Sequence, residues 1–175
     1  QFTEPEIRAA VEAADNWGTY VTVHTYTPRA IRQAVAAGVK CIEHGQLIDE
    51  PTAKLLAEKD VWWSLQPLLD DEDVPELSPG SREKASVVFA GTDYAYKLAK
   101  KYKIKTAWGT DVLFSRKLAQ QQGAILASLV RWYTPAEALI MATGTNAELL
   151  ALSGKRSPYA GKLGVVEQGA LGDLL

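Results

Sequence analysis

The hydrophobic positions of this chain follow two spacings, one typical of helices and one typical of buried strands. In the stretches 3–16, 27–38, 49–60 and 82–103, apolar residues recur every three or four positions, and the first three open with a Thr or Asp cap and a proline. Between them, 20–24, 39–44, 61–65 and 104–108 are short, nearly continuous apolar runs. Such runs favour strands buried on both faces. The pattern therefore predicts an α/β fold with a parallel sheet covered by helices.

The rest of the chain is predicted to be a long loop and three further helices. The stretch 66–80 contains three prolines and an acidic run from Asp70 to Asp73, which is typical of a loop or lid. Helices are expected over 120–132, over 134–142 after the Thr134-Pro135 cap, and over 145–152.

Three of the predicted strands end on side chains that can bind a metal. His24, His44 and Asp111 follow the runs Val-Thr-Val, Cys-Ile-Glu and Trp-Gly-Thr, and the chain has no other histidine. Because parallel strands bring their carboxyl ends to one edge, the three side chains are expected to share a cleft. Imidazole nitrogens and a carboxylate are typical zinc ligands. A lone histidine at a strand end is also often a hydrogen-bonded core residue, so this alternative stays open.

The composition of the chain argues against nucleic acids and membranes as binding partners. The chain has 175 residues, a hydrophobic fraction of 47% and a net charge of −2. Its basic residues are dispersed, so we expect no nucleic-acid partner. No run approaches the roughly 18 apolar residues of a membrane span, so we expect no membrane partner either. The single cysteine, Cys41, lies in an apolar run and is expected to be a small buried residue without an internal disulfide.

Four motifs follow one another along the chain, VHTYTPRAIRQAVAAGVKCIEHG, AWGTD, TPAEALIMATGTNAELL and GKLGVVEQGALGDLL. Together they resemble the C-terminal half of the amidohydrolase superfamily, in its branch similar to imidazolonepropionases and Xaa-Pro dipeptidases. The resemblance implies strands five to eight of a TIM (β/α)8 barrel over residues 1–155. Residues 156–175 would then begin the return to a small flanking β-sandwich.

The resemblance also implies roles for the strand-end residues. His24 and His44 would be metal ligands, and Asp111 would be both a ligand and the group that takes a proton from water during hydrolysis of an amide, peptide or cyclic amide bond. The cofactor would be one or two divalent ions, with zinc favoured. The substrate would be a small molecule or a peptide.

Four other polar residues lie near the predicted site. Tyr26 could donate its hydroxyl to a developing oxyanion or to a substrate carboxylate, although packing at a strand end is an equally good interpretation. Gln66 and Arg116 are candidate substrate contacts, with an exposed polar loop as the alternative for Arg116. Glu43 precedes His44 on its strand, so alternation predicts that it points towards the helices and makes a structural hydrogen bond or ion pair.

The chain begins at Gln1 and ends within an apolar run, and it lacks the His-x-His pair and the lysine that the resemblance places on earlier strands. We therefore expect a fragment that is inactive alone and that either pairs with the missing barrel half or forms a homo-oligomer. The cytoplasm is the favoured location. Two alternatives stay open, a non-catalytic half-barrel subunit or interaction module and an unrelated α/β binding domain with structural histidines.

Overall fold

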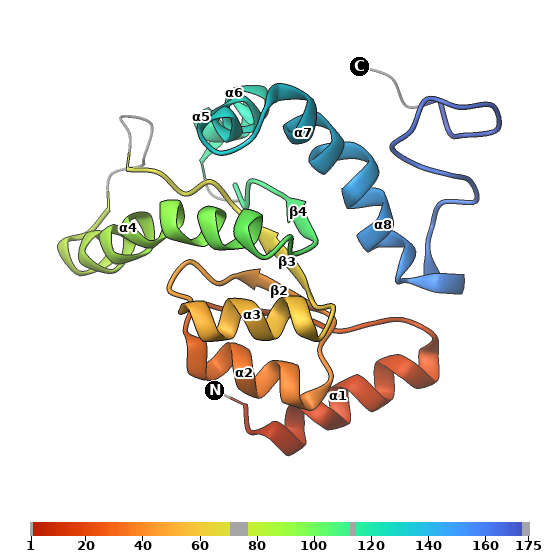
Figure 1. Ribbon diagram of the computed structural model, residues 1–175, viewed down its shortest axis with the longest axis horizontal. Coiled ribbons are helices and arrows are strands. Elements are labelled where there is room, and N and C mark those ends of the chain that lie inside the picture. Colours follow the sequence, from red (N-terminus) through yellow and green to blue (C-terminus); the bar gives the residue numbers. More distant parts are fainter. Residues whose placement is uncertain (1, 71–76, 113–114, 173–175) are drawn as a thin grey trace.

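A computed structural model describes residues 2–70, 77–112 and 115–172, and the fold is built on one parallel sheet (Figure 1). Its strands are β1 (Thr22–Thr25), β2 (Cys41–His44), β3 (Trp62–Leu65) and β4 (Thr106–Trp108). They lie in the order β1-β2-β3-β4, and every neighbouring pair is parallel. This arrangement confirms the predicted α/β class and brings the carboxyl ends of the strands to one edge.

The first three helices begin at capping residues that the sequence indicates, whereas the fourth begins after Ser78, within the stretch expected to be a loop. The helices are α1 (Glu4–Trp17), α2 (Pro28–Ala37), α3 (Glu50–Glu58) and α4 (Pro79–Lys101). Thr3 and Glu6 form a capping box on α1, and Asp49 accepts a hydrogen bond from the backbone N–H of Thr52 at the start of α3. Each helix packs against the next around the outside of the sheet (Figure 1).

The segment after β4 is more broken than the sequence predicts. It contains α5 (Arg116–Ala119), α6 (Gln122–Ala127), the 3₁₀ turn η1 (Ser128–Arg131), α7 (Pro135–Ile140), the π turn η2 (Met141–Thr145), α8 (Asn146–Ala151) and the 3₁₀ turn η3 (Gly154–Arg156). The helix expected over 120–132 is therefore divided between α6 and η1. The helices expected over 134–142 and 145–152 are joined by the π turn.

The two faces of the sheet pack against different partners. On one face, Ile42, Trp63 and Leu65 are fully buried in a core with side chains of the helices, including Leu56 and Tyr96. On the other face, Cys41, Trp62 and Ala107 pack in a smaller cluster with Leu149 of α8. Helix α8 thus covers the amino-terminal ends of the strands, on the face of the sheet away from α2, α3 and α4.

The free edge of β4 is covered by a side chain. Asn146 accepts a hydrogen bond from the backbone N–H of Trp108 at 2.9 Å and donates one to its carbonyl at 2.9 Å. A side-chain amide here takes the place of a neighbouring strand, which protects an edge that would otherwise present unpaired groups. Farther along, Arg156 donates to the carbonyl of Trp17 at 3.1 Å and ties the segment after α8 to the end of α1.

The structure tests the predictions for the C-terminal segment and for the loop 66–80 only in part. Within residues 156–172, Lys162 and Ala170 form an isolated β-bridge, so the flanking β-sandwich and the division at residue 155 stay predictions. In the loop 66–80, Asp70 pairs with Arg82, whereas the acidic residues Asp71, Glu72 and Asp73 lie outside the described residues. Among the described helices, none is long and apolar enough to cross a membrane.

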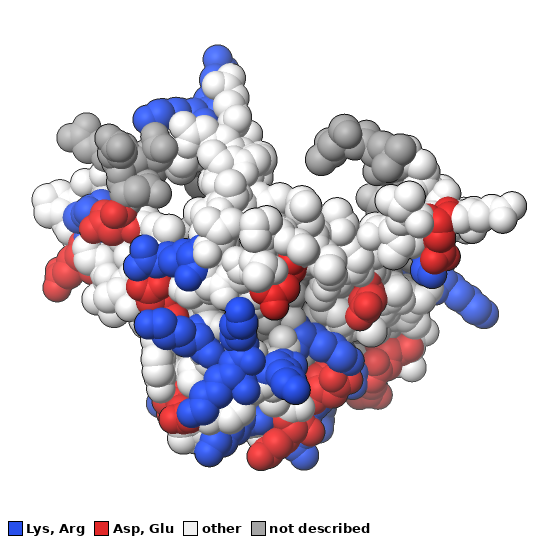
Figure 2. All heavy atoms as spheres, turned by 45° about the horizontal axis from the view of Figure 1, so that its top comes forward, with Lys and Arg blue, Asp and Glu red and all other residues white. Residues whose placement is uncertain are grey.

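Charged side chains on the surface are mostly mixed in sign. Figure 2 shows Lys and Arg interspersed with Asp and Glu on the viewed face. Several are paired, including Lys101 with Glu50 and Lys105 with Asp60.

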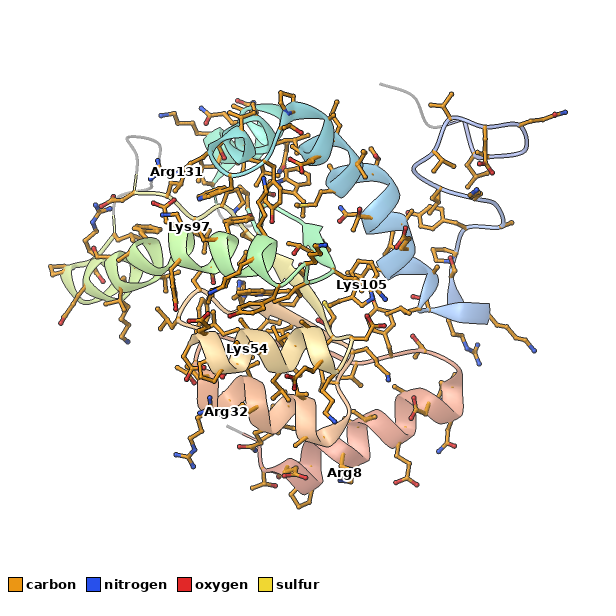
Figure 3. All side chains as sticks on the ribbon, in the orientation of Figure 1. Arg8, Arg32, Lys54, Lys97, Lys105 and Arg131 are labelled. Atoms are coloured by element: carbon orange, nitrogen blue, oxygen red, sulfur yellow. The ribbon has the colours of Figure 1, made fainter. Side chains whose placement is uncertain are left out.

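Arg131, labelled in Figure 3, makes two hydrogen bonds to Asp93 of α4. Its guanidinium is the main cause that lowers the pKa of the Asp93 carboxyl to about 2. The pair joins η1 to α4.

Candidate functional site

The two histidines meet at the carboxyl ends of β1 and β2. Nδ1 of His24 lies 2.8 Å from Nε2 of His44, and the ring centroids are 4.9 Å apart. The strands are adjacent and parallel, but the register pairs His24 with Glu43 and Thr25 with His44, so alternation alone would point the two rings to opposite faces. The predicted convergence of the histidines is nevertheless present in the structure.

The backbone at the end of β2 turns the ring of His44 towards His24. His44 has a φ of 74° and Gly45 a φ of 76°, in the left-handed region that residues other than glycine rarely adopt. The indole Nε1 of Trp63 donates to the carbonyl of His44 at 2.6 Å and holds this turn. Backbone strain of this kind costs about 1–3 kcal/mol and persists where the surrounding structure imposes it.

This turn overturns the orientation predicted for Glu43. Glu43 accepts a hydrogen bond from Thr22 Oγ1 at 2.8 Å, and its Oε1 lies 3.8 Å from the sulfur of Cys41. Cys41 belongs to the cluster on the face opposite the helix-side core, so Glu43 does not point towards the helices. The prediction was wrong because alternation was counted from His44, where the left-handed turn interrupts it. Glu43 does make a hydrogen bond, as expected.

A ring and an amide hold the imidazole of His44 from two sides. The ring of Tyr26 stacks on it with centroids 4.7 Å apart and planes inclined by 4°. Gln66 Oε1 lies 2.9 Å from its Nδ1, and both Gln66 and His44 are buried. Burial, and then the negative charge of Asp111, raises the pKa of Tyr26 above its ordinary value. The phenol therefore keeps its proton at neutral pH and is able to donate it in a hydrogen bond.

The other predicted residues are less closely gathered. Asp111 lies after β4 with a φ of 53°, and its Oδ2 is 3.9 Å from Nε2 of His44. Arg116 is exposed at the start of α5 and has no contact with the two histidines within the described part of the chain. The structure thus brings together His24, His44, Tyr26 and Gln66, with Asp111 at their border.

The donor atoms fit a divalent cation in part. The nitrogens of two imidazoles on one tetrahedral zinc lie about 3.3 Å apart, given Zn–N bonds of about 2.05 Å. The observed 2.8 Å between His24 Nδ1 and His44 Nε2 is a hydrogen-bond distance, so the two nitrogens would have to move apart slightly to share a cation. Over residues 2–70, 77–112 and 115–172, no three His, Cys, Asp or Glu side chains are grouped as tightly as a complete metal site requires. The two histidines are therefore a ligand pair in need of further ligands.

Two cavities flank the pair. One of about 590 Å³ is lined mainly by apolar side chains, among them Leu47, Leu68 and Phe89, with Lys84 and the ring of Tyr26. The other, of about 350 Å³, is lined by His24, Tyr26 and residues of α2. Tyr26 borders both cavities and stacks on His44, and His24 lines the second cavity directly, so both residues adjoin the space where a ligand could sit.

Two supporting residues were not identified from the sequence. Trp63 is buried in the core of the sheet, and its indole N–H also fixes the carbonyl of His44. Gly45 has no room for a side chain, because a Cβ would lie 2.7 Å from Trp63 Nε1. A glycine directly after a strand-end histidine was the available signal, since it indicates a left-handed turn.

The chain belongs to the amidohydrolase family, whose family model matches residues 1–175. It is similar to the crystal structure of an amidohydrolase, with 35% identity and a TM-score of 0.81 over 97% of this chain and 40% of that one. It is also similar to a prolidase complexed with N-methylphosphonate-L-proline, with 31% identity and a TM-score of 0.84 over 99% of this chain and 41% of that one.

A third similar structure is a Xaa-Pro dipeptidase with bound methionine in its active site, with 26% identity and a TM-score of 0.78 over 98% of this chain and 42% of that one. A search of curated proteins gives no match. The chain spans about two fifths of the length of these solved structures. The resemblance to the prolidase-like branch of the superfamily is thereby confirmed.

Proposed function

We propose that this chain forms part of a metal-dependent amidohydrolase that cleaves an amide or peptide bond, with Xaa-Pro dipeptides as the first substrates to test. The observation that carries the proposal is the 2.8 Å approach of His24 Nδ1 and His44 Nε2 at the carboxyl ends of adjacent parallel strands. This edge is where barrel enzymes carry their chemistry. The prolidase and dipeptidase relatives support the choice of substrate.

In this proposal the four strands are half of an eight-strand barrel. Their all-parallel order and the 40% share of the relatives' length support this arrangement. The outer edge of β1 would then pair with a strand from the other half of the barrel. That other half would also supply the ligands that complete the cation site.

His24 and His44 would hold the cation, with zinc favoured and one or two ions in the complete site. A divalent cation supplies a water of lowered pKa and polarises the carbonyl of the substrate. Asp111, whose carboxylate lies 3.9 Å from His44, would take up a proton and pass it to the leaving amine. Tyr26 would donate its hydroxyl to the substrate, because its raised pKa keeps the phenol protonated.

The apolar cavity beside Tyr26 would accept an uncharged side chain of the substrate. Its lining by Leu47, Leu68 and Phe89 suits apolar groups, and Lys84 at its border suits a carboxylate. Arg116 is exposed and lines neither of the two cavities beside the histidines. We therefore assign Tyr26 a more direct role than Arg116.

The test compares wild type with Asp111→Asn, in protein that carries this chain within a complete barrel. Hydrolysis of Xaa-Pro dipeptides is expected to fall by about 10²–10⁴-fold, the usual contribution of a general acid or base, while bound zinc changes little. Arg116→Gln, at an exposed position, serves as the matched control and should keep most of the activity. Full turnover in Asp111→Asn would contradict the assigned proton transfer.

A further inference from the structure

Gln66 occupies an unusual position for a residue that follows a strand at the active edge of a sheet. Its exposed fraction is 3%, and that of His44 is 5%. A side chain so deeply buried is not free to meet a substrate from solution. Its amide instead has two partners, the ring of His44 and a backbone carbonyl.

These two partners fix the orientation of the Gln66 amide. Nε2 donates to the carbonyl of Ser64 at 3.3 Å, and a carbonyl accepts hydrogen bonds without donating any. Oε1 must therefore be the atom that faces Nδ1 of His44, at 2.9 Å. Because an amide oxygen only accepts, Nδ1 of His44 must carry the proton.

The protonated Nδ1 determines the state of the other ring nitrogen. In a neutral imidazole one nitrogen carries hydrogen and the other has a free lone pair. Nε2 of His44 is thus the bare nitrogen, and it is the atom that lies 2.8 Å from His24. The lone pair that a cation requires is directed into the space between the two histidines.

Further contacts hold Gln66 and His44 in place. Gln46, which is also buried, donates from Nε2 to the backbone carbonyl of Gln66 at 3.3 Å. Trp63 fixes the carbonyl of His44, and Tyr26 stacks on its ring. The ring is therefore restrained at its backbone, at its face and at Nδ1, and its bare Nε2 accepts the hydrogen bond from Nδ1–H of His24, whose proton a cation would displace.

We propose that Gln66 is a positioning residue that imposes the Nδ1–H tautomer on His44 and thereby presents Nε2 as a ligand. This departs from the substrate contact expected for Gln66 from the sequence. The effect on a cation rests on the proposed function, whereas the tautomer itself does not. Partners of this kind typically contribute 10–100-fold to metal affinity.

The test is ¹⁵N NMR of the histidine-labelled chain without metal, at an alkaline pH where imidazoles are ordinarily neutral. In wild type, His44 is expected to show a protonated Nδ1 and a bare Nε2. Gln66→Leu removes the acceptor and should populate the Nε2–H form, and Gln66→Glu keeps an acceptor and should restore the Nδ1–H form. Thr106→Val removes a buried hydroxyl at the amino end of β4, which donates to the carbonyl of Ile104, and as a control should leave the tautomer unchanged.

Zinc titrations of the same proteins separate the two proposals. Gln66→Leu is expected to weaken zinc binding by about 10–100-fold and Gln66→Glu to recover most of it. A wild-type chain with Nε2–H on His44, or an unchanged tautomer in a folded Gln66→Leu variant, would overturn the role of Gln66. The first of these results, in wild type, overturns the role whether or not the variant folds. A complete barrel that carries this chain, with the expected tautomer but no zinc binding, would support the positioning role and contradict the proposed function.

Discussion

The two ends of the same four strands differ in almost every physical respect. At the amino ends, Cys41 and Trp62 pack with Ala107 and Leu149 in an apolar cluster. At the carboxyl ends, the buried imidazole of His44 is surrounded by polar and aromatic groups, and its backbone adopts the left-handed region. The comparison indicates that packing at one end stabilises a sheet whose other end tolerates strain and polar burial, as barrel enzymes generally do.

The largest effect is expected at the strained end, from Gly45→Ala. A Cβ at this left-handed position would lie 2.7 Å from Trp63 Nε1, so backbone strain and overpacking act together. We expect a loss of about 3 kcal/mol in the free energy of unfolding, measured by urea titration. Gly18→Ala is the control, since its φ is also positive but nothing lies within 4 Å, and it should lose about 1 kcal/mol. Equal losses would show that the contact with Trp63 is unimportant.

The apolar end is tested by Leu149→Ala. Removing this side chain leaves a void against Cys41 and Trp62, at an expected cost of about 2 kcal/mol. Leu150→Ala on the same helix, at an exposed position, should change stability by less than about 0.5 kcal/mol. The NMR signals of the two histidine rings should stay the same in both variants. Altered ring signals in Leu149→Ala would mean that the two ends are coupled.

The adjacent tryptophans allow a finer comparison. Trp63→Phe removes the donor to the His44 carbonyl, and a buried carbonyl without a partner costs about 1–2 kcal/mol. Trp62→Phe changes a similar area at the apolar end without this hydrogen bond. The expected distinction is that Trp63→Phe alone shifts the His44 ring signals and weakens zinc binding. Matching spectra for the two variants would contradict the supporting role of Trp63.

The smallest expected effect is the contribution of Cys41 to the pH dependence of the free energy of unfolding. Burial raises the pKa of its thiol from 9.0 to about 12. The folded state therefore resists an ionisation that the unfolded chain undergoes, so stability is fully present below pH 9 and declines as the pH rises through 12. At pH 9.5 the expected loss is about 0.8 kcal/mol, and it should be absent from Cys41→Ala. If the free energy of unfolding, measured by chemical denaturation, changed with pH in the same way in both proteins, the burial of the Cys41 thiol would be contradicted.

The sequence predicted the strands and most of the helices because its local signals agree with the fold. Apolar runs end at His24 and His44, and the Thr3, Thr27 and Asp49 caps begin helices where the structure has them. The orientation of Glu43 was wrong because it depends on the φ of a single residue. The partner of Gln66 was not predictable, since it depends on how the chain beyond β3 folds back onto β2.

The sequence predicted those residues of the candidate site that stand at the ends of the strands. Neighbouring parallel strands bring His24 and His44 to the same end of the sheet, and the left-handed turn at His44, which no spacing predicts, points the second ring at the first. The position of Asp111 depends on the left-handed backbone after β4. Its carboxylate lies 3.9 Å from His44, a distance that the spacing of residues along the sequence does not predict. The break in the helix expected over 120–132 likewise reflects tertiary packing, because Arg131 and Trp132 both bond to Asp93.

The central claim is that His24 and His44 are a ligand pair, and calorimetric zinc titration of protein that carries this chain within a complete barrel tests it most directly. Wild type should bind zinc saturably, and His24→Ala and His44→Ala should each weaken binding by more than about 10-fold while circular dichroism shows an intact fold. Equal zinc affinity in all three proteins, or no binding by wild type, would contradict the claim.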